Sequence, residues 1–232
     1  MAETAIRAAD GGSFAADLEL PARGTGPGLV LIQEIFGVNP WLRHVAQRVA
    51  AAGYVAMAPD LFWRLKPGVS LDADQEEEFK KGVGFMQRFD EAQGLNDLEA
   101  TIAALRAHPA STGKVGVLGF CLGGRLAFRL ACRASGDCAV AYYAVNLPAV
   151  LNEAGGIKAP LLLHIAANDK FVPPAAQAQI TAALEPNPNI TIHTYPGTDH
   201  GFARDGSHAY HPASAELANR RTGEFLRRHL GG

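Results

Sequence analysis

A cysteine, an aspartate and a histidine stand in an order that could perform acyl-transfer chemistry. Cys121 lies in GFCLG (residues 119–123), which fits the nucleophile elbow G-x-S-x-G with cysteine in place of serine. A free thiol is only slightly ionised at neutral pH, so it needs a base or a cation close by. Asp169 and His200 follow in the order nucleophile, acid, base. This set predicts attack of the sulfur on an ester-like carbonyl.

The sequence also leaves simpler explanations open. Cys121 could be a buried thiol in a glycine-rich turn, because free cysteines are usually buried and inert. Asp199 is a rival acid, but an adjacent carboxylate can seldom turn onto the neighbouring imidazole, which favours Asp169 as the partner of His200. Cys132 and Cys138 fit core positions on a helix and a strand.

Apolar runs of strand length alternate with amphipathic helical stretches along most of the chain. From Gly28 onward most runs are continuously apolar, as expected for an α/β protein with a mostly parallel sheet and helices on both faces. The first run alternates between apolar and polar side chains, which predicts an exposed edge strand. The predicted strands are Ser13–Leu20, Gly28–Gln33, Tyr54–Ala58, Val115–Leu118, Cys138–Tyr143, Pro160–Ala166 and Thr191–Tyr195.

Four helices have readable starts. The predicted start signals are Asn39-Pro40, Asn96 with Glu99 three residues later, Pro174, and Pro212. The first of these helices closes at Gly53. Residues 62–94 are the least regular part and predict a partly helical insertion, in which the acidic run at 76–78 forms a solvated face.

Composition favours a globular protein that acts on a small molecule. The 232 residues suit a single domain spanning 1–232, with 48% hydrophobic and 19% charged residues. A net charge of −2 and the lack of a basic run argue against nucleic-acid binding. No signal peptide and no run of about 20 apolar residues is visible, so we expect a cytoplasmic monomer away from membranes. His208 and His211 have no acidic or cysteine cluster beside them, so no metal is expected.

Four segments resemble the dienelactone hydrolase family, also called carboxymethylenebutenolidases. They are QEIFG at 33–37, GKVGVLGFCLGGRLAF at 113–128, NDKFVP at 168–173 and GTDHGFAR at 197–204. The resemblance implies an α/β-hydrolase fold and a cofactor-free hydrolase with a thioester intermediate. It implies that Glu34 pairs with the thiol and deprotonates it when substrate binds. The backbone N–H groups of Leu122 and Ile35 are the expected oxyanion hole.

The resemblance also implies a small carboxylate-bearing enol-lactone as substrate, with dienelactone giving maleylacetate. Arg204 matches one of two arginines that hold the carboxylate in the family, and Phe36 is expected to line the pocket. The second arginine should fall near Phe79 and is missing; Lys80, Lys81 or Arg88 could substitute for it, and Val83 stands where a tyrosine is expected. Two alternatives stay open: a hydrolase of another ester or lactone, and a non-catalytic redox-sensing or binding protein.

Overall fold

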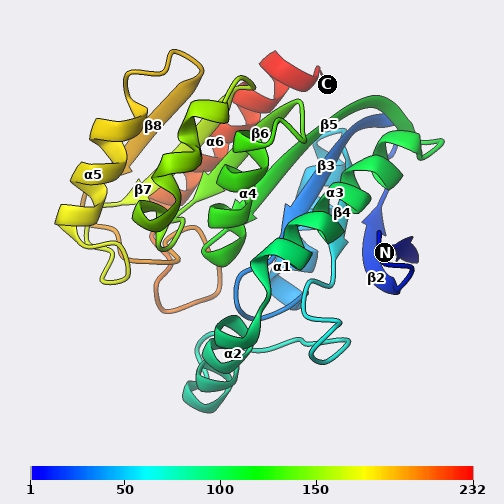
Figure 1. Cartoon of the computed structure of the whole chain (residues 1–232), viewed down its shortest axis with the longest axis horizontal. Coiled ribbons are helices and arrows are strands. Elements are labelled where there is room, and N and C mark those ends of the chain that lie inside the picture. The colour runs from blue at the N-terminus through cyan, green and yellow to red at the C-terminus, as the bar shows by residue number, and fades with distance from the viewer. Residues whose placement is uncertain (1, 232) are drawn as a thin grey trace. The chain divides into compact units, whose positions relative to one another are not determined.

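A computed structural model describes residues 2–231 and has the hydrogen-bonded strand order β1-β2-β4-β3-β5-β6-β7-β8. The described chain divides into two compact units, one ending at Val117 and the other covering Leu118–Gly231. Strand β5, Ser111–Phe120, runs through the boundary between them. Figure 1 labels the elements of both units. The single domain expected from the sequence stays a prediction.

The first unit contains the early strands and three helices. β3 and β4 pair in parallel, whereas β2 pairs antiparallel with both β1 and β4. Every residue of β3 and β4 is buried, and because successive side chains point to opposite faces, both faces of these strands are covered. The elements are β1 Ala2–Arg7, β2 Ser13–Glu19, β3 Gly26–Ile32, α1 Pro40–Ala51, β4 Val55–Pro59, α2 Glu76–Arg88 and α3 Glu91–Ala107.

The second unit continues with parallel strands. β6 pairs with β7 and β7 with β8, all in parallel, and β6 and β7 are fully buried. Helices α4 and α6 contact β6. Its elements are α4 Leu122–Cys132, β6 Cys138–Tyr142, the 3-10 helix η1 Leu147–Gly156, β7 Leu161–Ala166, α5 Pro174–Leu184, β8 Ile190–Tyr195 and α6 Pro212–Leu230. The continuously apolar runs therefore correspond to the buried parallel strands, as predicted.

A buried polar network joins α6 to the strands of this second unit. The two ring nitrogens of His164 lie 2.8 Å from Tyr195 Oη and 2.9 Å from Thr222 Oγ1, and Tyr142 Oη lies 2.7 Å from the same Thr222 oxygen. Burial lowers the pKa of His164 well below its ordinary value, and the positive charge of Arg221 acts in the same direction. The imidazole is therefore neutral, and its two hydrogen bonds satisfy it in the core.

The prediction of an edge strand at Ser13–Leu20 is wrong. β2 lies between β1 and β4, and β1 is the strand that the sequence pattern missed. β2 alternates because one of its faces is buried and the other is largely exposed, a pattern that an inner antiparallel strand shares with an edge strand. β1 is mostly exposed, so its sequence AETAIR carries little apolar signal.

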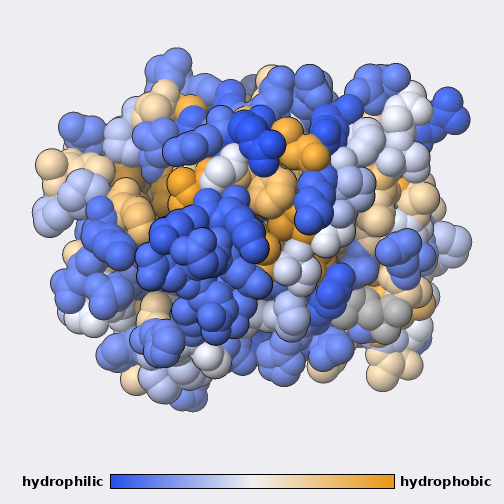
Figure 2. All heavy atoms as spheres, turned by 90° about the horizontal axis from the view of Figure 1, so that it is seen from below, coloured by the Kyte–Doolittle hydropathy of each residue, from blue (hydrophilic) through white to orange (hydrophobic). Residues whose placement is uncertain are grey.

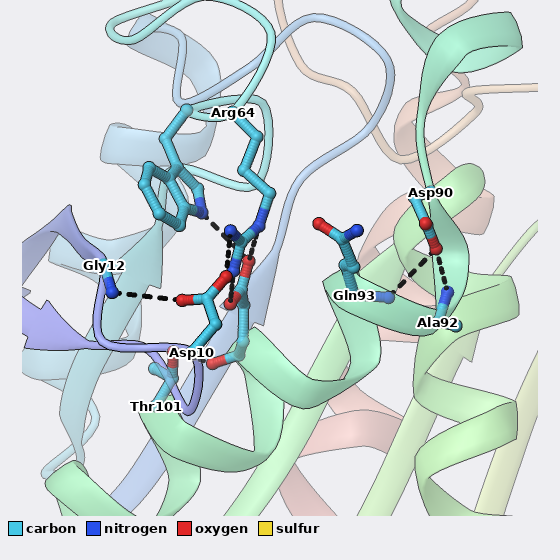
Figure 3. Close-up of polar contacts among 9 residues, drawn as sticks. Asp10, Gly12, Arg64, Asp90, Ala92, Gln93 and Thr101 are labelled. Carbon is cyan, nitrogen blue, oxygen red and sulfur yellow. Dashed lines mark hydrogen bonds and ion pairs between the residues drawn. The ribbon is translucent and has the colours of Figure 1, made fainter.

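Three of the four predicted helix starts are confirmed, and one is wrong. The side chain of Asn39 accepts a hydrogen bond from the N–H of Leu42, and α5 and α6 begin at their predicted prolines. Asn96 lies inside α3, which begins five residues earlier than that position. The cap is Asp90, whose carboxylate accepts the N–H groups of Ala92 and Gln93 (Figure 3). An aspartate at the true N-cap replaces the box-like signal further along.

The insertion at residues 62–94 is partly helical, as predicted. It contains α2 and ends at the first turn of α3. The acidic run at 76–78 occupies the first turn of α2; Glu76 and Glu77 are exposed as predicted, whereas Glu78 is partly buried and accepts the N–H of Asp72. Viewed from below, hydrophilic side chains gather over α2 (Figure 2). Aromatic contacts inside the insertion hold its beginning to its later part, with the ring of Phe62 5.3 Å from Phe85 and 5.7 Å from Phe89.

Arg64 fixes the beginning of the insertion to two other segments. Its guanidinium contacts the buried carboxylate of Asp97 on α3 at 2.8 Å and Asp10 in the β1–β2 turn at 2.6 Å (Figure 3). Trp63 donates its indole N–H to the same Asp97 at 2.9 Å. The Asp97 side chain is 2% exposed, so these donors replace the water that it loses on folding.

We expect Asp97→Ala to lower the free energy of unfolding by about 2–3 kcal/mol, because it leaves the Arg64 guanidinium and the Trp63 N–H without their shared acceptor. Urea unfolding followed by circular dichroism measures the change. Glu77→Ala is the matched control, since it removes a surface ion pair with Lys80 from a side chain that is 78% exposed. Equal stability of the two variants would contradict a structural role for Asp97.

Candidate active site

The chain reverses sharply at Cys121, between β5 and α4. Cys121 has φ 55° and ψ −113°, a conformation that residues other than glycine rarely adopt. Its N–H donates to the carbonyl of Tyr142 in β6 at 3.0 Å, and its carbonyl accepts the N–H of Arg125 in α4 at 3.2 Å. The side chain thus stands at the end of a strand and before the first turn of a helix, as the elbow motif predicts.

Glycine is required beside the cysteine because the reversed backbone leaves no room. A Cβ at Gly119 would overlap the carbonyl group of Gly123 in the first turn of α4. Leu122 is the first residue of α4 and is buried, so its backbone N–H is one of the N–H groups that no helical carbonyl satisfies.

The predicted acid and base are hydrogen-bonded to each other. His200 Nδ1 lies 2.6 Å from Asp169 Oδ2, and the N–H of Phe171 donates to Asp169 Oδ1 at 2.8 Å. Asp169 follows β7 and His200 follows β8, so two adjacent parallel strands deliver both side chains to one edge. Asp199, the rival acid, is exposed.

Cys121 acts on the charge of the same imidazole, so the thiol, His200 and Asp169 form one group of interacting side chains. The His200 side chain is 9% exposed and that of Asp169 is 1% exposed. Burial lowers the pKa of His200, but the negative charge of Cys121 and the hydrogen bond that the imidazole donates to Asp169 outweigh it and raise the pKa to about 10. The imidazole of His200 is therefore protonated at neutral pH.

Two aromatic rings that the sequence did not single out flank the imidazole. Tyr143, which is buried, makes an edge contact with His200 at 4.9 Å between ring centres. Phe171 makes another at 5.0 Å and is 44% exposed. Phe171 lies inside the NDKFVP segment, which the sequence analysis had identified. Its contact with His200, 29 positions away, could not be predicted because it depends on the tertiary fold.

The expected cation Arg204 is 8% exposed and lies in the loop that carries His200. Its guanidinium is so close to the backbone of Gly201 that a Cβ there would lie 2.6 Å from Arg204 Nη2. Arg125 bonds to the carbonyl of Asn146 and fits a structural role. Among the cations suggested for the missing arginine, Lys80 pairs with Glu76 and Glu77 at the surface.

The other expected site residues belong to the first unit. Glu34, Ile35 and Phe36 follow β3 and are 3%, 4% and 3% exposed. Helix α2 packs on this segment: the ring of Phe79 lies 6.0 Å from that of Phe36, and a Cβ at Gly82 would lie 2.9 Å from the carbonyl oxygen of Ile35.

Within residues 2–231, no group of three or more histidine, cysteine, aspartate or glutamate side chains could hold a metal ion. In the same range, no helix combines the length and apolar character needed to cross a membrane.

A model of the dienelactone hydrolase family matches residues 14–230. The chain belongs to the dienelactone hydrolase family. A protein from Azospirillum brasilense, provisionally named carboxymethylenebutenolidase, is 44% identical to it over the whole of both chains. A carboxymethylenebutenolidase from Pseudomonas sp. (strain P51) is 41% identical, with 96% of this chain and 93% of that protein covered.

A crystal structure of a provisionally named dienelactone hydrolase from Klebsiella pneumoniae subsp. pneumoniae has a TM-score of 0.86 at 27% sequence identity, covering 98% of each chain. The predicted α/β-hydrolase fold is confirmed for this member of the dienelactone hydrolase family, as is the resemblance itself. The protein is a hydrolase of the lactone and ester class.

We expect Gly119→Ala to lower the free energy of unfolding by about 1–3 kcal/mol and to abolish ester hydrolysis, because the elbow must distort to admit the methyl group. Chemical unfolding and turnover of an aryl ester measure the two effects. In Gly84→Ala, the control on α2, a Cβ meets nothing within 4 Å, so stability should rise by about 0.5–1 kcal/mol with full activity. An active Gly119→Ala enzyme would exclude the tight elbow.

We expect the rate of Cys121 alkylation by iodoacetamide to depend on His200, because an imidazolium with a pKa of about 10 beside the sulfur favours attack by the thiolate. In His200→Gln the rate at pH 7 should fall at least tenfold and then rise toward the ordinary thiol pKa of about 8.5. Peptide mass spectrometry identifies which cysteine is alkylated. The other two should react slowly, because Cys138 is 1% exposed and burial raises the pKa of Cys132 to about 12.

A wild-type alkylation rate that rises tenfold per pH unit from 6 to 8 would instead place the proton on sulfur in the resting protein, and Glu34 would then be the base that removes it.

The contribution of His200 to the free energy of unfolding has a defined pH window. Since its folded pKa is raised, this stabilisation is full below the unfolded value of about 6.5 and is lost as the pH rises through about 10.

Proposed function

We propose that the protein hydrolyses a small carboxylate-bearing enol-lactone, dienelactone, to maleylacetate through a cysteine nucleophile. The observation that carries the proposal is the hydrogen bond between His200 and Asp169, in a member of the dienelactone hydrolase family whose Cys121 interacts electrostatically with the same imidazole. Relatives that match nearly the whole chain are named carboxymethylenebutenolidase, which supports the same substrate.

In the proposed mechanism, Cys121 Sγ attacks the lactone carbonyl and the ring C–O bond breaks. His200 gives a proton to the departing enolate oxygen, and a thioester remains on Cys121. His200 then takes a proton from water, which attacks the thioester and releases the product and the thiol. Asp169 holds the imidazole with Nδ1 bonded, so that its other nitrogen faces the reaction.

The backbone N–H groups of Leu122 and Ile35 are proposed to bind the oxygen that becomes negative during both steps. Glu34 is proposed to take any proton that remains on Cys121 Sγ when substrate binds, and to return it to the sulfur when the thioester is hydrolysed. No cofactor takes part in these steps. The enzyme is further proposed to be a cytoplasmic monomer that binds neither nucleic acid nor membrane.

Arg204 is proposed to pair with the substrate carboxylate, and Phe36 to contribute to the pocket wall. Lys170, adjacent to the acid and exposed, is a further cation on the loops of the candidate site. Lysine supplies charge without the bidentate geometry of arginine. The family's second carboxylate-binding arginine is missing in this chain. If Lys170 does not take its place, the alternative proposal is a different small ester or lactone as substrate, with the same chemistry at Cys121.

The alternative function is that of a redox-sensing protein without catalytic activity, because an ionised thiol reacts with oxidants. A sensor needs the thiolate but not the hydrogen-bonded acid behind the histidine. Thiol ionisation alone does not separate the two functions, whereas turnover does.

We expect purified protein to remove the ultraviolet absorbance of dienelactone, and Cys121→Ala to lower kcat by at least about 10⁴-fold while it keeps the same circular dichroism spectrum. His200→Ala should be similarly inactive. Fast loss of absorbance that survives in Cys121→Ala would rule out the nucleophile. Without any loss of dienelactone, Cys121-dependent turnover of phenyl acetate would retain the mechanism and exclude this substrate.

A further inference from the structure

Phe171 is an exposed aromatic residue on a rigid loop beside the candidate base. Its side chain is 44% exposed, whereas Tyr143 on the imidazole is 1% exposed. Large apolar side chains normally gain from burial, and this ring stays half exposed next to the histidine with the ammonium of Lys170 5.2 Å from its centre.

The loop around Phe171 is held by several hydrogen bonds. The N–H of Phe171 donates to Asp169 Oδ1 at 2.8 Å, and the N–H of Val172 donates to the carbonyl of Asp169 at 3.1 Å. The side-chain amide of Gln177 on α5 donates to the carbonyl of Val172 at 2.8 Å and lies within 3.2 Å of the carbonyls of Ala166 and Ala167. The position of the ring is therefore fixed by its backbone and does not depend on a mobile loop.

The position beside His200 determines which part of a substrate meets the ring. In the proposed mechanism His200 delivers the proton to the leaving oxygen, so the leaving group lies against the imidazole. Phe171 contacts that imidazole edge-on, with 5.0 Å between the ring centres and 82° between the planes. Phe171 therefore contacts the side chain that gives the proton to the leaving oxygen.

We infer that Phe171 is a specificity-determining residue that selects esters and lactones whose leaving group is a flat, unsaturated enol or phenol. A flat π-system makes stacked or edge contacts with the ring that a small saturated alcohol cannot make. The inference rests on the proposed function and adds the class of leaving group to it. The residue acts by contact with substrate, since its role toward Asp169 is performed by its backbone N–H.

The test compares phenyl acetate with trifluoroethyl acetate in the wild type and in Phe171→Ala. The change caused by the variant in each kcat/KM is measured, so that the different reactivities of the two esters cancel. We expect Phe171→Ala to lower kcat/KM for phenyl acetate roughly tenfold, and that for trifluoroethyl acetate less than twofold. Phe171→Leu keeps an apolar side chain and should lose less. Tyr210→Ala removes another exposed aromatic side chain and should change neither value.

An equal fall for both esters in a folded Phe171→Ala would overturn the inference, because the ring would then position His200 and not the leaving group. No change for either ester would also overturn it. Cys121→Ala is measured with the same esters: residual turnover there marks failure of the proposed function, whereas an inactive Cys121→Ala beside an unselective Phe171→Ala marks failure of the inference alone.

Discussion

The candidate site depends on one backbone constraint, the reversal of the chain at Cys121. A non-glycine residue with φ of 55° costs on the order of 1–3 kcal/mol and persists only where its surroundings impose it. Here β5 and α4 impose it, and the hydrogen bond from Cys121 to Tyr142 ties the turn to β6. The reversal puts the sulfur at the strand end and the N–H of Leu122 at the start of a helix, so one strained residue positions both a thiol and a backbone N–H group.

The charge of His200 is set by the opposing effects of burial and of its neighbours. Burial alone would leave His200 neutral, because an imidazolium loses hydration in a site where its side chain is 9% exposed. The thiolate on one side and Asp169 on the other reverse that preference and raise the pKa to about 10. Each group is thus stabilised by its neighbours, and the loss of one changes the proton affinity of the others.

The sequence predicted the features that depend on neighbouring residues in the chain. The elbow at Cys121 and the buried parallel strands were readable because glycines and apolar runs specify them directly, and the pairing of Asp169 with His200 followed from chain order. Tertiary contacts were not readable. The ring of Phe171 meets a histidine on another loop, and β1 is a strand because β2 pairs with it, although its own residues carry a weak apolar signal.

The insertion has two fixed ends. Its beginning is held by Arg64 on Asp97 and by Phe62 on its own aromatic neighbours, and its end is the capped start of α3 at Asp90. The free energy of closing a loop rises only with the logarithm of its length. Residues between these anchors can therefore be gained or lost at little cost to the sheet, so this segment offers evolution, or an engineer, the easiest place to change the length of the chain.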